Sequence, residues 1–181
     1  MRVLITYATA HGSTKGVATE IGGRLAASGL SVDVLPAEGV GSLDGYDAVV
    51  IGSAVHNGAW LPPASSLIDH HVDELASRPV WLFSVSSVGE SSSFFGARVA
   101  AVMRRMRGEP RQVTTLRRSI GARAHRMFAG AIEPSHWGRA GNLFLEVLGG
   151  TYGDHRDWLD IDAWAAEIAW QLLAVDRPAS P

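Results

Sequence analysis

Apolar residues gather in five short runs along the chain, and most of these runs are followed by small, polar or glycine-containing stretches. Nearly continuous runs rich in Val, Ile and Leu are typical of strands that are covered on both faces, as in a parallel sheet. We therefore expect a buried sheet of five strands. The runs predict strands at residues 3–7, 31–35, 47–53, 79–85 and 127–132.

Between these runs, apolar residues recur every three or four positions, which is the spacing of a helix with one buried face. Val17, Ala18, Ile21 and Leu25 form the first such stripe, and Gly29 supplies the glycine that commonly ends a helix. Further helices are predicted at residues 64–75, 94–106, 136–148 and 161–172.

The alternation of strands and helices indicates an α/β fold, in which a doubly wound five-stranded parallel sheet carries helices on both faces. Sheets of this kind bind ligands beyond the carboxyl ends of their strands, where the strand order reverses. Neither an internal repeat nor a linker is evident in residues 1–175. We expect one domain over these residues and a frayed tail at 176–181.

The loop after the first predicted strand has the composition of a phosphate site. Its hydroxyl groups can donate to phosphate oxygens, its glycine lets the backbone approach closely, and the following helix offers free N–H groups and a positive dipole end. Because it lacks both the GxGxxG fingerprint and the GK[ST] of a triphosphate loop, it suits a terminal monophosphate. Capping of the helix by Ser13 or Thr14 explains the same pattern without a ligand. The candidate residues are Thr9, Ala10, His11, Gly12, Ser13 and Thr14.

Two further loops leave inner strands, and both are small and polar enough for their backbones to lie against a flat ring. Trp60 could stack on such a ring, or it could pack beneath the turn at Pro62 and Pro63. His56 could tune the ring or carry a proton near neutral pH, or it could be an ordinary loop residue. The candidates are Ser53, Ala54, Val55, His56, Asn57, Gly58 and Trp60 in one loop, and Ser86, Ser87, Val88 and Gly89 in the other.

Three segments together resemble the flavodoxin superfamily: the TxHGST loop at residues 9–14, VVIGSAVHNGAW at 49–60 and LFSVSSVG at 82–89. With MFAGAI at 127–132 and GDHRDWLDIDAWAAEIA at 153–169, the chain looks closest to the bacterial menaquinone-dependent protoporphyrinogen oxidase branch. The resemblance covers essentially the whole chain. It implies the strand order 2-1-3-4-5, a known arrangement in which FMN lies at the point where the order reverses.

The resemblance also implies where FMN would bind. Its phosphate would lie at residues 9–14, and its isoalloxazine ring would lie between the loops at 53–60 and 86–93. His11 stands where flavodoxins commonly carry threonine, so an imidazole N–H would have to replace one hydroxyl donor. The segment at 91–125 matches the oxidase branch least, and the identity of the substrate would be decided there.

Composition and charge narrow the picture further. The chain has 181 residues and no cysteine, which excludes disulfides, thiolate metal sites and cysteine nucleophiles and fits a cytoplasmic protein. We expect neither a signal peptide nor a membrane span. The net charge is −2, yet nine arginines and one acid between Arg98 and Arg126 give that segment about +8. It is either a solvated helical face or a basic surface beside the flavin.

These observations leave two classes of function. The leading one is an FMN-dependent oxidoreductase, because a flavin carries the chemistry itself and the sequence shows no triad, metal cluster or catalytic carboxylate pair. It would be a protoporphyrinogen dehydrogenase with menaquinone as acceptor, or a simple electron carrier. Arg104, Arg105 and Arg107 would then meet substrate carboxylates or the anionic inner face of a membrane, with no nucleic acid. The other class is a flavin-free binding module that uses the basic segment for nucleic acid or an anionic surface.

Overall fold

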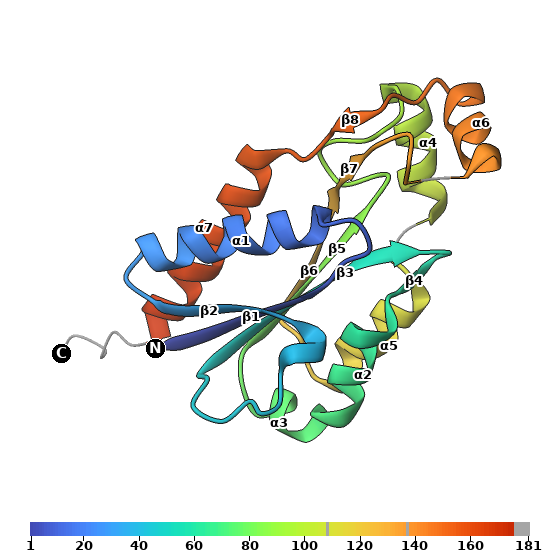
Figure 1. Ribbon diagram of the computed structural model, residues 1–181. Coiled ribbons are helices and arrows are strands. Elements are labelled where there is room, and N and C mark those ends of the chain that lie inside the picture. Colours follow the sequence, from blue (N-terminus) through green and yellow to red (C-terminus); the bar gives the residue numbers. More distant parts are fainter. Residues whose placement is uncertain (108, 137, 176–181) are drawn as a thin grey trace.

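Five parallel strands form the centre of the computed structural model, which describes residues 1–107, 109–136 and 138–175 (Figure 1). Their order is β2-β1-β3-β5-β6. Counted over the parallel strands alone, this is the predicted order 2-1-3-4-5, so the predicted fold class is confirmed. The strands are β1 (Arg2–Ala8), β2 (Ser31–Pro36), β3 (Ala48–His56), β5 (Val80–Ser86) and β6 (Ala124–Ala129).

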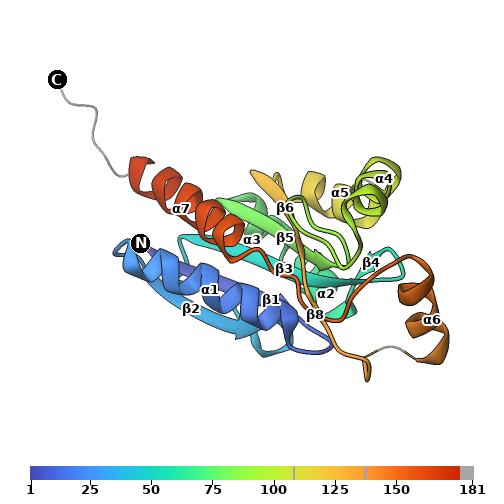
Figure 2. The same cartoon turned by 90° about the horizontal axis from the view of Figure 1, so that it is seen from above.

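Helices cover both faces of this sheet (Figures 1 and 2). One face carries α1 (Ser13–Ala27) and α7 (Trp158–Val175). The other carries α2 (Pro62–His70), α3 (Val72–Ala76) and α5 (Arg111–Ser119), and the short η1 (Ala37–Gly39) follows β2. Among the described helices, none is both long and apolar enough to cross a membrane.

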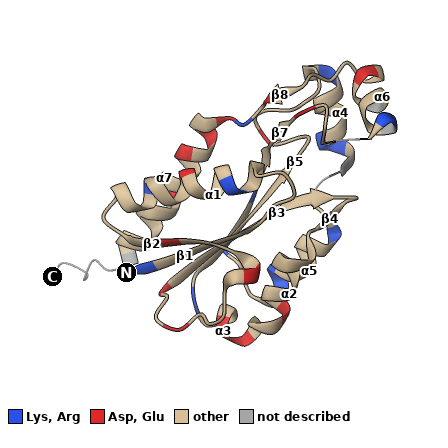
Figure 3. Cartoon of the chain, viewed as in Figure 1, with Lys and Arg blue, Asp and Glu red and all other residues tan. Residues whose placement is uncertain are grey.

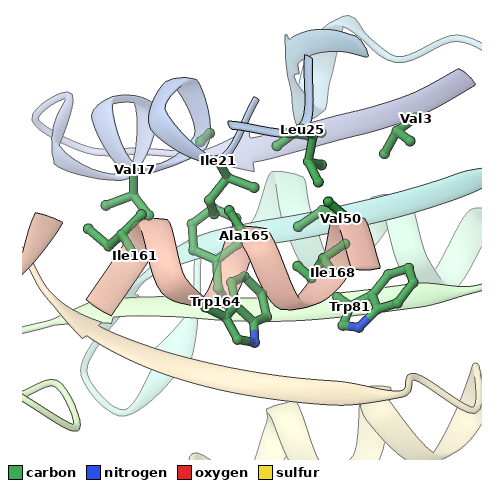
Figure 4. Packing of buried hydrophobic residues seen from close by; sticks show 14 of the residues in the cluster. Val3, Val17, Ile21, Leu25, Val50, Trp81, Ile161, Trp164, Ala165 and Ile168 are labelled. Carbon is green, nitrogen blue, oxygen red and sulfur yellow. The ribbon is translucent and has the colours of Figure 1, made fainter. Parts of the chain in front are cut away.

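Side-chain alternation along each strand divides the core into two layers, because successive residues of a strand point to opposite faces. Val3 and Ile5 of β1 face α1 and α7, whereas Leu4 faces the opposite layer. In the first layer, Val17 and Ile21 of α1 lie against α7 (Figure 4). The α7 residues in this contact are Ile161, Trp164, Ala165 and Ile168. The stripe predicted at 161–172 is therefore the buried side of α7.

Gly52 in the middle of β3 makes room for the ring of Phe83 on the neighbouring strand. A Cβ at this position would overlap that ring, which is fully buried and lies 6.2 Å from the Phe128 ring centroid. We expect Gly52→Ala to lower the free energy of unfolding by about 1–3 kcal/mol, because a packed ring has nowhere to move. Urea unfolding measures this. Gly23→Ala is the control, since a Cβ there meets nothing within 4 Å on α1 and should be neutral or stabilising.

A third cluster lies beyond the carboxyl ends of the strands and supports the loops there. It joins Phe94 and Phe95, from the loop after β5, to Ile132 of β7 (Ala131–Ile132) and Leu145 of α6 (Arg139–Val147). Val99 and Met103 of α4 (Ala97–Arg107) pack against it, and β7 pairs with β8 (Gly153–Asp154). The segments around β7, β8, α4 and α6 thus enclose the end of the sheet at which ligands are expected.

The structure corrects several predicted boundaries. The helix predicted at 64–75 is interrupted at His71, where φ is −118°, and becomes α2 and α3. The strand predicted at 127–132 begins three residues earlier, and Gly130 separates β6 from β7. The prediction also missed α5, whose nine residues contain only two buried apolar positions, Val113 and Leu116. So short a helix leaves a weak periodic signal.

Candidate functional site: a cleft at the carboxyl ends of the strands

The loop between β1 and α1 forms one end of a cleft. Gly12 precedes α1 with φ of 84°, a left-handed conformation that glycine adopts readily, and its N–H donates to Thr9 Oγ1 at 3.0 Å. The helix begins at Ser13, so its first N–H groups have no acceptor within the helix. The loop therefore presents several backbone donors and the positive end of the helix dipole.

Thr14 carries a buried polar atom in the cleft that lacks a hydrogen-bond partner in the described part of the chain. Its side chain is fully buried and lines the cleft, yet Oγ1 has no hydrogen-bond partner among the described residues. A buried hydroxyl left in this state costs about 1–3 kcal/mol. No side chain caps α1, so the capping interpretation of Ser13 and Thr14 is wrong. An acceptor atom from a ligand would satisfy Thr14.

Ser13 makes a tertiary hydrogen bond that the sequence did not indicate. Its Oγ accepts the backbone N–H of Ala131 at 2.9 Å, which fastens the segment after β6 to the start of α1. Gly130 permits this approach, because a Cβ there would lie 2.8 Å from Ser13 Oγ. The Ser13 hydroxyl hydrogen is still available to donate, since Oγ serves as the acceptor in this contact.

The three predicted loops meet in this cleft, whose volume is about 140 Å³. The β1–α1 loop contributes Thr9, Ala10, His11, Ser13 and Thr14 to the lining. The end of β3 contributes Ala54, Val55 and His56, and the end of β5 contributes Ser86 and Ser87. Residues that the sequence analysis did not select complete the lining: Leu61, Val85, Phe94, Gly130, Ala131, Ile132 and His136. MFAGAI is predicted above as a strand and as part of the family resemblance, but not as part of the site.

Other predicted residues lie outside the cleft lining. Asn57 and Gly58 form the exposed turn of a hairpin between β3 and β4 (Ala59–Trp60), with φ of 51° and 78°. An Asn-Gly pair is a strong hairpin signal, and this hairpin is absent from the elements predicted above. Ser53 is buried, and its Oγ accepts the N–H of Leu61 at 3.0 Å, so it supports the hairpin instead. Val88 and Gly89 line a neighbouring cavity.

Trp60 packs in the core and is only 3% exposed. Its indole N–H donates to Ser84 Oγ at 2.7 Å, inside the protein. The suggestion that Trp60 stacks on a flat ring is therefore wrong for this arrangement. The alternative of packing near the Pro62 turn is what the structure shows, because Trp60 joins the same buried cluster as the residues of α2.

A second cavity of about 420 Å³ adjoins the cleft and shares Ser86 and Ser87 with it. Its lining combines apolar side chains with charges of both signs: Val88, Met103, Met127, Glu90, Glu109, Arg104, Arg117 and His125. Both carboxylates have partners in the protein, since Glu90 accepts from Met127 N at 3.3 Å and Glu109 accepts from Thr114 at 2.9 Å. Arg117 lies 3.9 Å from Glu109, beyond hydrogen-bond distance, so its guanidinium can still donate to a ligand in this cavity.

A buried polar chain runs from the hairpin to this second cavity. Ser84 Oγ accepts from Trp60 and lies 2.8 Å from His125 Nε2, while His125 Nδ1 faces Glu109 Oε1 at 2.9 Å. We assign the His125 proton to Nδ1, beside the carboxylate, so that Ser84 can donate to Nε2. Burial lowers the pKa of His125 from 6.5 to about 4, against the opposing charge of Glu109.

The order Ser84, His125, Glu109 has the spacing of a hydrolytic triad, but it cannot act as one here. Ser84 is fully buried, and its oxygen already accepts the Trp60 indole. A nucleophile must reach its substrate, so these residues connect β4, β5, β6 and the α4–α5 loop structurally.

Blue segments on α4 and α5 mark arginines of the basic segment in Figure 3. Contacts of several arginines in this segment hold this end of the fold together. Arg104 donates to the carbonyls of Gly89 at 2.7 Å and Ser92 at 3.1 Å, and Arg126 binds Glu90 and Asp160. The prediction that Arg104 meets an external anion therefore needs revision, because two of its nitrogens already position the loop after β5. The side chain of Arg107 lies outside the described residues. Besides Arg104, the exposed arginines of the described part of this segment are Arg98, Arg105, Arg111, Arg118 and Arg123.

Comparisons with known proteins agree with this architecture. Residues 4–140 match the family model of the flavodoxin domain, and the chain therefore belongs to the flavodoxin domain family. A flavodoxin from the domain Archaea is 16% identical and superposes with a TM-score of 0.60 over 96% of this chain and 99% of the other. A variant of the flavodoxin from Pseudomonas aeruginosa is 19% identical, with a TM-score of 0.59 and coverage of 96% and 99%.

A larger redox protein contains the same fold as one part. The rubredoxin:oxygen oxidoreductase of the anaerobe Desulfovibrio gigas is 15% identical and gives a TM-score of 0.62 over 96% of this chain but only 36% of its own. No curated protein matches the sequence of this chain. At these identities, the similarity to solved structures shows the fold alone.

Proposed function

We propose that this protein binds FMN in the cleft and transfers electrons through it. The observation that carries the proposal is the buried, unpartnered Thr14 Oγ1, beside the free N–H groups at the start of α1. Together they form a set of donors that a phosphate monoester would satisfy. FMN would supply the redox chemistry, and the chain would position it and exclude water.

The residues present fit the two ends of FMN differently. The β1–α1 loop supplies hydroxyl and backbone donors for the phosphate, and the polypeptide at Ala54–His56 and Ser86–Ser87 supplies walls for the ring. With about 140 Å³, the cleft is smaller than the roughly 300–1,000 Å³ of typical ligand pockets, so binding requires side chains or loops to move. Asn57 and Gly58 form an exposed turn next to the lining residue His56, so a shift of this turn would widen the cleft.

The direct experiment is to purify the protein, record its absorbance spectrum and identify any flavin by mass. Calorimetry with FMN, riboflavin and FAD then tests the phosphate site. We expect FMN to bind with one-to-one stoichiometry and more tightly than either of the others. Equal affinity for riboflavin would contradict the phosphate assignment, and failure of all three to bind would overturn the proposal.

The second cavity favours an enzyme over a simple carrier. A carrier needs only an exposed flavin edge, whereas a cavity of about 420 Å³ that shares a wall with the cleft has the size of a small-molecule site. The resemblance to the oxidase branch supports protoporphyrinogen as donor and menaquinone as acceptor. Arg117, whose guanidinium comes no closer than 3.9 Å to Glu109, would suit a substrate carboxylate.

Anaerobic mixing tests this finer proposal. Protoporphyrinogen should bleach the oxidised flavin, and a menaquinone analogue should restore its colour. We expect Met103→Trp, which fills the cavity, to raise the KM for the donor roughly tenfold without loss of FMN. Val102→Trp is the matched control, because Val102 is the preceding residue of α4 and is 56% exposed. If both variants change the KM for the donor equally, the cavity is not the donor site.

The exposed arginines support a proposed contact with an anionic membrane surface on the cytoplasmic side. We expect Arg105→Glu to weaken binding to vesicles that contain anionic lipid at low salt, with the difference fading at high salt because exposed charges are screened. Arg24→Glu on α1 is the control with the same change in charge. If both variants bind vesicles as the unmodified protein does, the exposed arginines are a solvated surface.

A flavin-free binding module remains the second candidate, but the structure gives it less support. Arg104, Arg117 and Arg126 interact with groups of the protein itself, and Arg123 lies over the Trp81 ring at 5.1 Å. The continuous basic surface that this function would need is therefore reduced.

A further inference from the structure

Two histidines that are distant in sequence form a stacked pair at the phosphate end of the cleft. The ring centroids of His11 and His136 are 4.2 Å apart, and the planes differ by only 7°. Both residues line the cleft. His11 belongs to the β1–α1 loop, and His136 lies in the segment between β7 and α6.

The position of the pair is fixed by contacts between these two segments. Ser13 Oγ accepts the N–H of Ala131, which ties the start of the His136 segment to α1. His155 N–H donates to the Gly130 carbonyl at 3.1 Å, which ties the same stretch to the residue after β8. The unpartnered Thr14 Oγ1 lies in the same cleft. An anion that satisfies Thr14 would therefore bind beside the histidine pair.

The two imidazoles differ in their hydrogen bonds. The Glu133 N–H donates to His136 Nδ1 at 3.2 Å, which makes that nitrogen an acceptor and favours a neutral ring with its proton on Nε2. Neither ring nitrogen of His11 has a hydrogen-bond partner among the described residues, and His11 is exposed. His11 is thus the member of the pair that can accept a proton without breaking a contact.

Several charged groups lie near this pair. The Arg156 guanidinium reaches the first turn of α1 at Gly16 and binds Asp154 at 2.6 Å. The Glu133 carboxylate is 3.7 Å from His136 Nε2 and is itself 72% exposed. His56 is the remaining titratable side chain of the cleft lining, and Lys15 follows in the first turn of α1. A phosphate dianion bound here would be the largest local charge, and imidazole is the side chain that changes charge between pH 5 and 8.

We propose that His11 takes up a proton when the phosphate of FMN binds and that the neutral ring of His136 holds the resulting imidazolium by stacking. This inference rests on the proposed FMN site and adds a cationic group to it. It makes the affinity for FMN depend on pH, whereas the affinity for riboflavin, which has no phosphate, does not. Stacking on a neutral aromatic ring favours a cation.

Calorimetry at pH 7.5 in two buffers of different ionisation enthalpy measures the proton uptake directly. We expect up to about one proton per FMN and none per riboflavin, and an increase in the Kd for FMN of up to about tenfold per pH unit between pH 7 and 9. The phosphate is already a dianion in this range, since its second pKa is about 6, so it contributes little to the change.

Two substitutions separate the roles of the pair. His11→Phe keeps the stack and removes the proton acceptor, so proton uptake should vanish; His11→Gln should give the same result without an aromatic ring. His136→Phe keeps both the stack and His11, and should retain the uptake. Uptake that is equal for riboflavin, or that survives in both His11 variants, would overturn the inference while leaving the FMN site in place. If no flavin binds at all, the inference and the proposed function both fail.

Discussion

Replacing Thr14 by valine should weaken FMN binding by roughly ten- to hundredfold. Thr14 Oγ1 is buried in the cleft without a partner, and a hydrogen bond to a charged phosphate contributes about 1.5–3 kcal/mol. Riboflavin should bind Thr14→Val as well as it binds the unmodified protein. Calorimetric titration with both ligands measures the two effects.

The same substitution should have the opposite effect on the stability of the flavin-free protein. Valine has nearly the shape of threonine and removes the buried hydroxyl, so the free energy of unfolding should rise by about 1 kcal/mol. Thr19→Val, on the exposed side of α1, is the control and should change neither quantity. An unchanged Kd for FMN in Thr14→Val would show that the phosphate does not contact this residue.

Acid should destabilise the protein through His125. Its pKa is lowered from 6.5 to about 4 in the folded state, chiefly by burial. Between these two pH values the unfolded chain therefore binds a proton at His125 that the folded chain does not bind. The stability that depends on a neutral His125 is fully present above pH 6.5 and is lost as the pH falls toward 4. The loss amounts to about 3 kcal/mol at most.

Urea unfolding at several pH values between 7 and 4 measures this loss. His125→Gln cannot titrate, so its stability should be lower at pH 7 but should fall less steeply with acid. His70→Gln is the control, because His70 is exposed on α2. If His125→Gln and the unmodified protein lose stability in parallel, His125 is not the group that acid protonates.

The sequence was informative wherever the signal is local. The apolar runs located β1, β3 and β5, because a strand covered on both faces has to be apolar along its length. They also located β2 and the second half of β6. The loop at Thr9 to Thr14 could also be found from a local signal. It follows a strand and begins a helix, and its small residues and hydroxyls are adjacent in the sequence. The Asn57-Gly58 hairpin turn was also present in the sequence, as a local Asn-Gly signal.

By itself the sequence thus determined the α/β architecture and the loops that gather at one end of it. Only the tertiary structure decided which side chains of those loops meet. His11 stacks on His136, Ser13 binds Ala131, and Trp60 and His125 converge on Ser84, in each case across long stretches of chain. Periodicity and turn signals depend on residues a few positions apart, whereas these contacts depend on how β3, β5 and β6 are ordered and on where Gly130 allows two segments to approach.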